Sequence, residues 1–199
     1  SLVRLSMQVA KKGLAGLEFA SGIPGTVGGA VFMNAGAYKS DMGYVVQDAT
    51  VLTPDLRVIK LENKEMNFHY RTSFLKTHPG YICLEVVIRL DKGNRAAIEE
   101  VIKDRRKRRM DSQPLNYPSA GSVFRNPEGM SAWKLIDDAG LKGFSIGGAK
   151  VSEKHANFII NYNHATGEDI KSLIEYVQQK VKEDCKVELK LEQEFVNWE

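Results

Sequence analysis

A run of glycines and small residues from Gly22 to Tyr38, GIPGTVGGAVFMNAGAY, constrains this 199-residue chain more than any other feature. Gly22, Gly25, Gly28 and Gly29 permit backbone angles closed to other residues and let main-chain N–H groups approach a planar or phosphorylated ligand. Their spacing differs from the dinucleotide-binding fingerprint, and no lysine follows as in a P-loop. The segment therefore predicts either a backbone that faces a ligand or a glycine-rich turn that packs two elements together.

Composition narrows the class of protein. A hydrophobic fraction of 43% is typical of a globular chain with real cores, and no apolar run reaches the ~18 residues of a membrane span. The net charge of +3 suits an anionic small substrate but is too weak to predict nucleic-acid binding. Cys83 and Cys185 lie far apart, which favours reduced thiols in a cytoplasmic protein, and no residues show metal-ligand spacing. Because the chain starts without Met or a secretory signal, we expect a piece of a longer protein.

Periodicity predicts a mixed α+β chain in two domains, residues 1–92 and 93–199, divided where Asp91 to Asn94 break the pattern. The basic end of one predicted helix, residues 105–109, is interpreted as a solvated face, because cations are favoured at a helix C-terminus and no aromatic residues interleave with it. Thr166 and Asp169 form a capping-box signature. We expect helices over 2–13, from Pro24 to Asn34, over 96–110, around 133–139 and over 166–184, and strands over 46–53, 57–61, 81–90 (well buried), 156–163 and 187–195.

Three further residues have side chains suited to chemistry. Arg71, in YRTSF, is either a surface arginine or a guanidinium that clamps a carboxylate and stabilises negative charge beside it. Ser122, in SAGSVFRNP, is either a turn former or a proton donor; it lacks the GxSxG elbow of a nucleophile. Glu194 shares a predicted strand face with charged residues, so periodicity alone places it in solvent.

Three segments together resemble a known family. GLEFASGIPGTVGGAVFMNAGAY, YRTSF and YPSAGSVFRNP stand in the order and rough spacing of the UDP-N-acetylenolpyruvoylglucosamine reductases (MurB), and the similarity covers essentially the whole chain. The resemblance implies the C-terminal part of a MurB/PCMH-like FAD-binding domain followed by an α+β substrate-binding domain. It also implies a cytoplasmic flavoenzyme of cell-wall peptidoglycan synthesis that uses NADPH and FAD to reduce UDP-N-acetylglucosamine enolpyruvate to UDP-N-acetylmuramate, with no nucleic-acid or membrane partner.

The resemblance also implies roles for individual residues. Arg71 matches the active-site arginine, Ser122 the proton-donating serine and Glu194 the C-terminal catalytic glutamate. Substrate contacts are implied for Tyr70, Arg71, Gly121, Ser122, Asn126 and Asn157, and no metal is expected. FAD contacts are implied for Gly22, Ile23, Pro24, Gly25, Thr26, Gly28, Gly29, Asn34, Ala35, Gly36 and Tyr38.

The chain departs from the family pattern in several places. The family's flavin domain begins earlier, with a loop around the FAD pyrophosphate, so we expect this piece alone to bind FAD weakly or not at all. The interval from Arg71 to Ser122 matches the shorter type, without an inserted loop. Ser112 stands where a lysine is frequent, and Val196 or Asn197 where an arginine is frequent, which weakens the expected sugar-diphosphate contacts. Two alternatives stay open: a flavin oxidoreductase of the same fold on another substrate, and a UDP-sugar-binding fragment without turnover.

Overall fold

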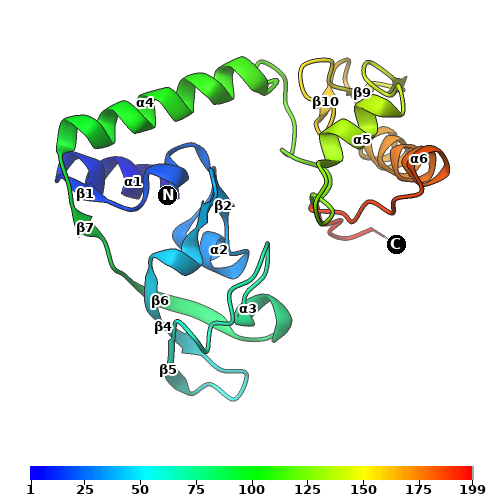
Figure 1. Cartoon of the computed structure of the whole chain (residues 1–199). Coiled ribbons are helices and arrows are strands. Elements are labelled where there is room, and N and C mark those ends of the chain that lie inside the picture. The colour runs from blue at the N-terminus through cyan, green and yellow to red at the C-terminus, as the bar shows by residue number, and fades with distance from the viewer. Residues whose placement is uncertain (199) are drawn as a thin grey trace. The chain divides into compact units, whose positions relative to one another are not determined.

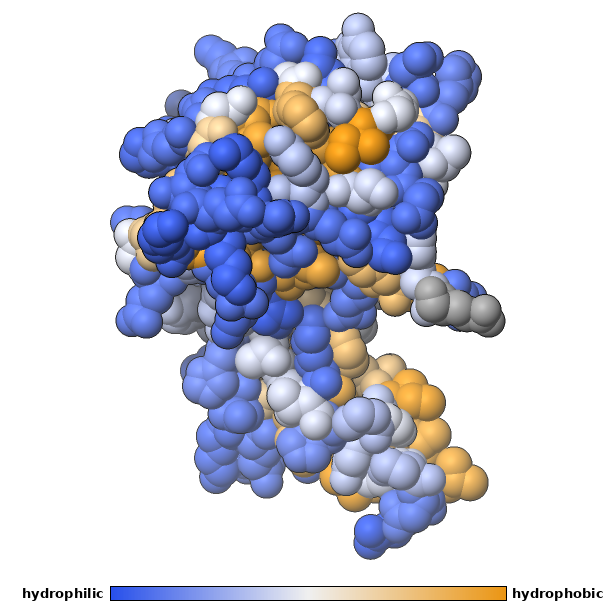
Figure 2. All heavy atoms as spheres, turned by 90° about the vertical axis from the view of Figure 1, so that its right-hand side faces the viewer, coloured by the Kyte–Doolittle hydropathy of each residue, from blue (hydrophilic) through white to orange (hydrophobic). Residues whose placement is uncertain are grey.

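The computed structural model describes residues 1–198 and divides into two compact units, Ser1–Arg109 and Met110–Glu199, each with its own apolar core. Helices and strands mix in both units, which confirms the α+β prediction (Figure 1). Hydrophilic residues cover much of the face seen in Figure 2, interrupted by apolar patches. None of the helices within residues 1–198 is both long and apolar enough to cross a membrane.

The first unit is built around a three-stranded antiparallel sheet with β4 (Val46–Leu52) between β5 (Val58–Glu62) and β6 (Ile82–Ile88). The hairpin predicted from the two β-rich runs is thereby confirmed. Val51, Met42 and Phe19 are fully or almost fully buried in the core beside the sheet. The remaining elements are α1 (Leu2–Lys11), β1 (Leu14–Ala15), 3-10 helix η1 (Glu18–Gly22), α2 (Val27–Phe32), β2 (Gly36–Ala37), β3 (Ser40–Asp41), η2 (Met42–Tyr44), α3 (Phe74–Thr77), β7 (Asp91–Lys92) and α4 (Arg95–Ser112).

Two predictions about this unit were wrong in detail. The short helix in the glycine-rich segment begins at Val27 and not at Pro24, because the Thr26 hydroxyl accepts a hydrogen bond from the Gly29 N–H and caps it there. Strand β6 is not well buried: Ile82 and Leu84 are 55% and 54% exposed. The strand pairs with β4 along one edge and presents alternate side chains to opposite faces of the sheet, only one of which is covered.

The division between the units falls after Arg109, later than the predicted boundary at residue 92. Helix α4 begins as predicted, just after Asn94, whose side chain accepts from the Ala97 N–H. Ile98 and Ile102 on this helix are buried against Ala10 and Ala15 of the first unit. The helix therefore belongs to the first unit by packing, although a break in the sequence pattern precedes it.

The second unit packs the long helix α6 (Gly167–Cys185) against a small antiparallel sheet of order β10-β9-β8. The predicted capping box at Thr166 and Asp169 is confirmed in both directions, with hydrogen bonds of 3.1 and 2.9 Å. Ile174, Val177 and Val181 on α6 are buried in the core. The other elements are α5 (Ala132–Asp138), β8 (Ser145–Ile146), β9 (Ala149–Val151) and β10 (Ile159–Asn161).

The predicted strand over residues 187–195 was wrong as a sheet member. Within the described residues this segment makes one isolated bridge, Leu191 to Phe124, and Leu189 is buried while Phe195 is 38% exposed. Backbone hydrogen bonds attach it to residues 123–125 instead of to the β8–β10 sheet. The alternating sequence therefore marks an extended segment held by another loop.

Candidate active site

The glycine-rich segment exposes bare backbone. Pro24, Gly25 and Thr26 are exposed between η1 and α2, and Gly25 has φ of +123°, a conformation that only glycine adopts easily. A Cβ atom placed on Gly25 or Gly28 would meet no other atom within 4 Å. The two glycines are therefore not required by packing inside the unit. Open space against bare backbone fits a ligand better than it fits a packing turn.

Arg71 folds back onto the same segment. Its Nη2 donates to the Gly36 carbonyl at 3.0 Å, and its guanidinium carbon lies 5.0 Å from the centroid of the Tyr70 ring. A tight turn positions it: His69 and Thr72 exchange backbone hydrogen bonds of 3.1 Å, and Arg71 has φ of +56°. Such a conformation costs about 1 kcal/mol or more and persists where the surroundings impose it. The structure thus brings Arg71 and the glycine-rich segment together in one unit.

Asn34, predicted as an FAD contact, is committed to internal hydrogen bonds. It is 2% exposed, donates to the His69 carbonyl at 2.8 Å and accepts from the Gly43 N–H at 2.9 Å. Its side chain ties the end of the glycine-rich segment to the turn that carries Arg71. Buried amides are usually satisfied by the protein itself, and the two polar atoms of this side chain each have a partner within the unit.

Two arginines of α4 also reach this segment, which the sequence analysis missed. The guanidinium carbon of Arg105 lies 4.9 Å from the centroid of the Tyr38 ring. The Tyr38 hydroxyl donates to the backbone carbonyl of Arg105 at 2.9 Å. A Cβ on Gly22 would come within 2.6 Å of the Arg109 guanidinium, so the Arg109 side chain lies directly against this glycine. Burial lowers the pKa of Arg109. The prediction of a solvated basic face holds for residues 106–108, which are exposed, but not for these two.

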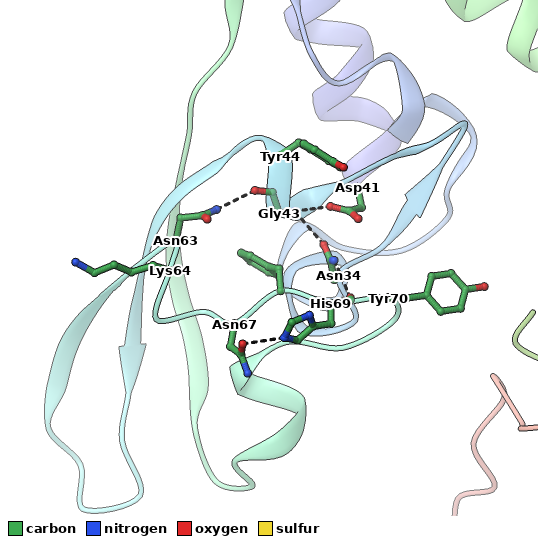
Figure 3. A pocket seen from close by; sticks show the side chains of 10 residues that line it. Asn34, Asp41, Gly43, Tyr44, Asn63, Lys64, Asn67, His69 and Tyr70 are labelled. Carbon is green, nitrogen blue, oxygen red and sulfur yellow. Dashed lines mark hydrogen bonds between the residues drawn. The ribbon is translucent and has the colours of Figure 1, made fainter. Parts of the chain in front are cut away.

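A hollow of about 420 Å³ is lined in part by residues 67–70, which directly precede Arg71 (Figure 3). It was not predicted, and of the predicted site residues only Asn34 and Tyr70 line it. Its walls are tied together internally: Asn63 donates to the Gly43 carbonyl at 2.8 Å, and Asn67 and His69 share a hydrogen bond of 2.9 Å. The lining residues are Asn34, Asp41, Gly43, Tyr44, Asn63, Lys64, Asn67, Phe68, His69 and Tyr70.

Ser122 lies in an extended segment of the second unit that is held on both sides. On one side it pairs with Phe158; on the other, Glu192 N–H donates to the Val123 carbonyl at 2.8 Å. The Gln193 side chain reaches the Gly121 carbonyl at 3.4 Å, and Glu194 follows directly. Both Ser122 and Glu194 are exposed. The predicted serine and glutamate, remote in sequence, are thus carried by two segments bonded to each other.

The predicted substrate contacts of the second unit differ in availability. Gly121 has φ of +82° and open space where a Cβ would lie, so it leaves the approach to Ser122 clear. Asn126 is exposed, and its side-chain Oδ1 accepts from the Ala132 N–H at the start of α5. Asn157, in contrast, is 4% exposed and engaged by the backbone of Phe124. The Asn126 side chain therefore remains exposed, whereas the side chain of Asn157 is buried and has both polar atoms engaged.

The cysteines and the acidic residues point to no additional chemistry. Cys83 and Cys185 are free thiols, and burial raises the pKa of Cys83, so its thiolate is disfavoured. Within residues 1–198, no group of three or more His, Cys, Asp or Glu side chains is arranged to hold a metal ion. The candidate groups are therefore bare backbone and one guanidinium in the first unit, and one hydroxyl and one carboxylate in the second unit.

Comparison with known proteins yields two family matches and close relatives. Residues 113–196 match the family described as UDP-N-acetylenolpyruvoylglucosamine reductase, C-terminal domain, and residues 1–62 match an FAD binding domain. The UDP-N-acetylenolpyruvoylglucosamine reductase of Anoxybacillus flavithermus is 48% identical over 98% of this chain and 65% of its own length. That of Caldanaerobacter subterraneus subsp. tengcongensis is 54% identical over 88% of this chain and 58% of its own length.

A solved structure agrees with these relatives. The crystal structure of UDP-N-acetylenolpyruvylglucosamine reductase (MurB) from Thermus caldophilus superposes with a TM-score of 0.85 at 37% identity, over 97% of this chain and 68% of that one. The chain spans about 65% of the length of the first curated relatives that it matches.

Proposed function

This chain belongs to the UDP-N-acetylenolpyruvoylglucosamine reductase family, and from that premise we propose that the protein carrying it reduces UDP-N-acetylglucosamine enolpyruvate to UDP-N-acetylmuramate with FAD and NADPH. We place the reaction in the cytoplasm, in peptidoglycan synthesis, and hence in cell-wall growth, cell shape and division. The partner is a small UDP-sugar, without nucleic acid or membrane. The observation that carries the proposal is the hydrogen bond from the Arg71 guanidinium to the Gly36 carbonyl of the glycine-rich segment.

The residues of the first unit fit a flavin dinucleotide. Gly25 and Gly28 have open space where side chains would otherwise stand, and Thr26 is exposed between them. Pro24, Ile23 and the other predicted contacts flank these glycines along the same segment. FAD, when bound, supplies the two-electron chemistry that links NADPH to the substrate. The protein would hold it by main-chain contacts along residues 22–38.

Arg71, Ser122 and Glu194 would act on the enolpyruvyl group. Hydride addition to the methylene carbon leaves negative charge on the neighbouring carbon and its carboxylate, which the Arg71 guanidinium would stabilise by bidentate hydrogen bonding. The Ser122 hydroxyl would donate the proton to that neighbouring carbon, and Glu194, carried by the adjacent segment, would assist by hydrogen bonding. Loss of the Ser122 proton donor should therefore slow turnover more than it weakens substrate binding.

Ser122→Ala is the test of this proposal. We expect kcat for enolpyruvyl-dependent NADPH oxidation, in the presence of FAD, to fall by about 10²–10⁴, the range for loss of a general acid. Ser145→Ala, on strand β8 and exposed, is the matched control and should leave kcat unchanged. Turnover of Ser122→Ala equal to that of the control would contradict the assigned role. An absorbance titration with FAD at the same time measures how tightly this chain holds the cofactor.

Calorimetry separates the two alternatives. Titration with UDP-N-acetylglucosamine enolpyruvate is carried out with and without FAD, at one protein concentration. Binding that is identical in both conditions, without turnover, favours a UDP-sugar-binding fragment. No binding in either condition, together with NADPH oxidation on a different acceptor, favours a flavin oxidoreductase on another substrate. Binding and turnover together support the proposal.

A further inference from the structure

The side chain of Asn157 completes the hydrogen bonding of one backbone residue, Phe124. The side-chain Oδ1 of Asn157 accepts from the Phe124 N–H at 3.0 Å, and its side-chain Nδ2 donates to the Phe124 carbonyl at 2.8 Å. Asn157 is 4% exposed and Phe124 is 2% exposed. The amide therefore behaves as a neighbouring strand would, pairing with both polar groups of one residue. A substrate contact by this side chain would break two buried hydrogen bonds, which disfavours that role.

Asn157 also holds the preceding residue and is itself held. The backbone carbonyl oxygen of Asn157 accepts from the Val123 N–H at 2.9 Å, so the main chain and the side chain of this asparagine together hold two consecutive residues. The His155 Nδ1 accepts from the Asn157 N–H at 3.3 Å, which requires an unprotonated Nδ1. Burial lowers the pKa of His155, whose ring packs at 4.9 Å from Phe158 and 6.5 Å from Trp133. The hydrogen bonds between Asn157 and residues 123–124, called here the Asn157 clamp, thus lie next to a packed aromatic cluster.

The clamp acts directly beside the candidate proton donor. Ser122 immediately precedes Val123 and is exposed, so the direction of its hydroxyl depends on the backbone that carries it. We propose that Asn157 is a positioning residue whose side chain fixes Phe124 and thereby aims the Ser122 hydroxyl two residues earlier; the inference rests on the role proposed for Ser122. A displacement of about 1 Å at a reacting group can cost ~10²-fold in rate.

Two variants of Asn157 and one control test the inference in the protein carrying this sequence. Asn157→Leu removes both hydrogen bonds and keeps the size of the side chain. Asn157→Asp keeps the shape; its carboxylate cannot donate to the Phe124 carbonyl, whereas the protonated acid donates and accepts as the amide does. Asn161→Leu, on β10, is the matched control, because the side-chain oxygen of Asn161 accepts from the Ala165 N–H, outside the segment that carries Ser122.

Three readouts are measured for each variant. Amide hydrogen exchange over residues 123–125 should quicken in Asn157→Leu and not in the control. Enolpyruvyl-dependent NADPH oxidation should fall by about 10–10²-fold in Asn157→Leu. NADPH oxidation with ferricyanide as acceptor, which needs no proton from Ser122, should be unchanged. In Asn157→Asp, enolpyruvyl turnover relative to wild type at the same pH should rise as the pH is lowered, together with amide protection.

The outcomes separate the inference from the proposed function. Faster exchange at residues 123–125 with normal enolpyruvyl turnover, or unchanged exchange in Asn157→Leu, would overturn the positioning role and leave the proposed function standing. Equal loss of the ferricyanide reaction would also overturn it, because the damage would then extend beyond the Ser122 step. Full turnover in both Ser122→Ala and Asn157→Leu would overturn the proposed role of Ser122 and the inference together. Recovery of enolpyruvyl turnover and amide protection by Asn157→Asp as the pH is lowered supports the positioning role.

Discussion

The ion pair between Arg125 and Glu192 offers a quantitative test of the contact between the Ser122 segment and the C-terminal segment. Arg125 Nε lies 3.4 Å from Glu192 Oε2, and the two side chains are 30% and 20% exposed. At that distance the attraction is about 5 kcal/mol for an effective dielectric constant of ~20. Desolvation of both groups offsets most of it, so we expect a coupling free energy of roughly 1–2 kcal/mol, between exposed and fully buried pairs.

A double-mutant cycle with Arg125→Gln and Glu192→Gln measures that coupling. Urea unfolding is followed by the fluorescence of Trp133 and Trp198, the two tryptophans of the chain, which both lie in the second unit. The exposed pair Lys134–Asp138, at 3.1 Å and 63% and 53% exposed, is the matched control and should couple by about 0.3–0.5 kcal/mol. A coupling for Arg125–Glu192 no larger than the control would refute the argument that this contact is held electrostatically.

Three other predictions concern the glycine-rich segment, Arg71 and the capping box of α6. Gly28→Ala should leave the free energy of unfolding unchanged or raise it slightly, because the added methyl group meets no atom within 4 Å. The same substitution should weaken FAD binding in an absorbance titration. Arg71→Gln should lower kcat by about 10²–10³, measured as enolpyruvyl-dependent NADPH oxidation. Backbone hydrogen bonds from Thr166 and Gly148 lower the pKa of Asp169. Asp169→Asn should therefore be less stable than the wild type at neutral pH, and this difference in unfolding free energy should vanish as the pH falls below 3.8, where the carboxylate is protonated. A difference that does not change with pH would contradict this.

Local signals predicted well where the chemistry is local. Thr166 and Asp169 satisfy each other across one helical turn, so the start of α6 needed no information from the rest of the chain. The same holds for the hairpin of β4 and β5, which are joined by a short turn. The segment around Leu191 failed for the opposite reason: its alternation matched a strand, but its partner is a loop residue, Phe124, far away in sequence. Periodicity reports one exposed face and does not report the partner.

The basic end of α4 shows why the site itself was only partly predictable. From sequence, residues 105–109 form one uninterrupted charged run. In the structure, Arg105 and Arg109 turn toward Tyr38 and Gly22, while the residues between them stay exposed. One helical turn separates the two contacting arginines, but nothing in the run marks which face meets the glycine-rich segment. That choice is made by the packing of Ile98 and Ile102 earlier on the helix.

Asn34 and Asn157 were both predicted as ligand contacts, and the structure gives them the same task in different units. Each is buried and ties down a stretch of backbone next to a candidate catalytic residue: Asn34 holds the carbonyl of His69, close to Arg71, and Asn157 holds Phe124, close to Ser122. Ser122 is exposed and Arg71 is half-buried, so the orientation of these candidate side chains depends on the backbone that carries them. A buried amide supplies a donor and an acceptor at one point, which suits it to irregular segments that lack a neighbouring strand. In this chain, both polar residues next to a candidate catalytic residue bond the protein's own backbone, which supports that backbone whether or not a ligand also approaches.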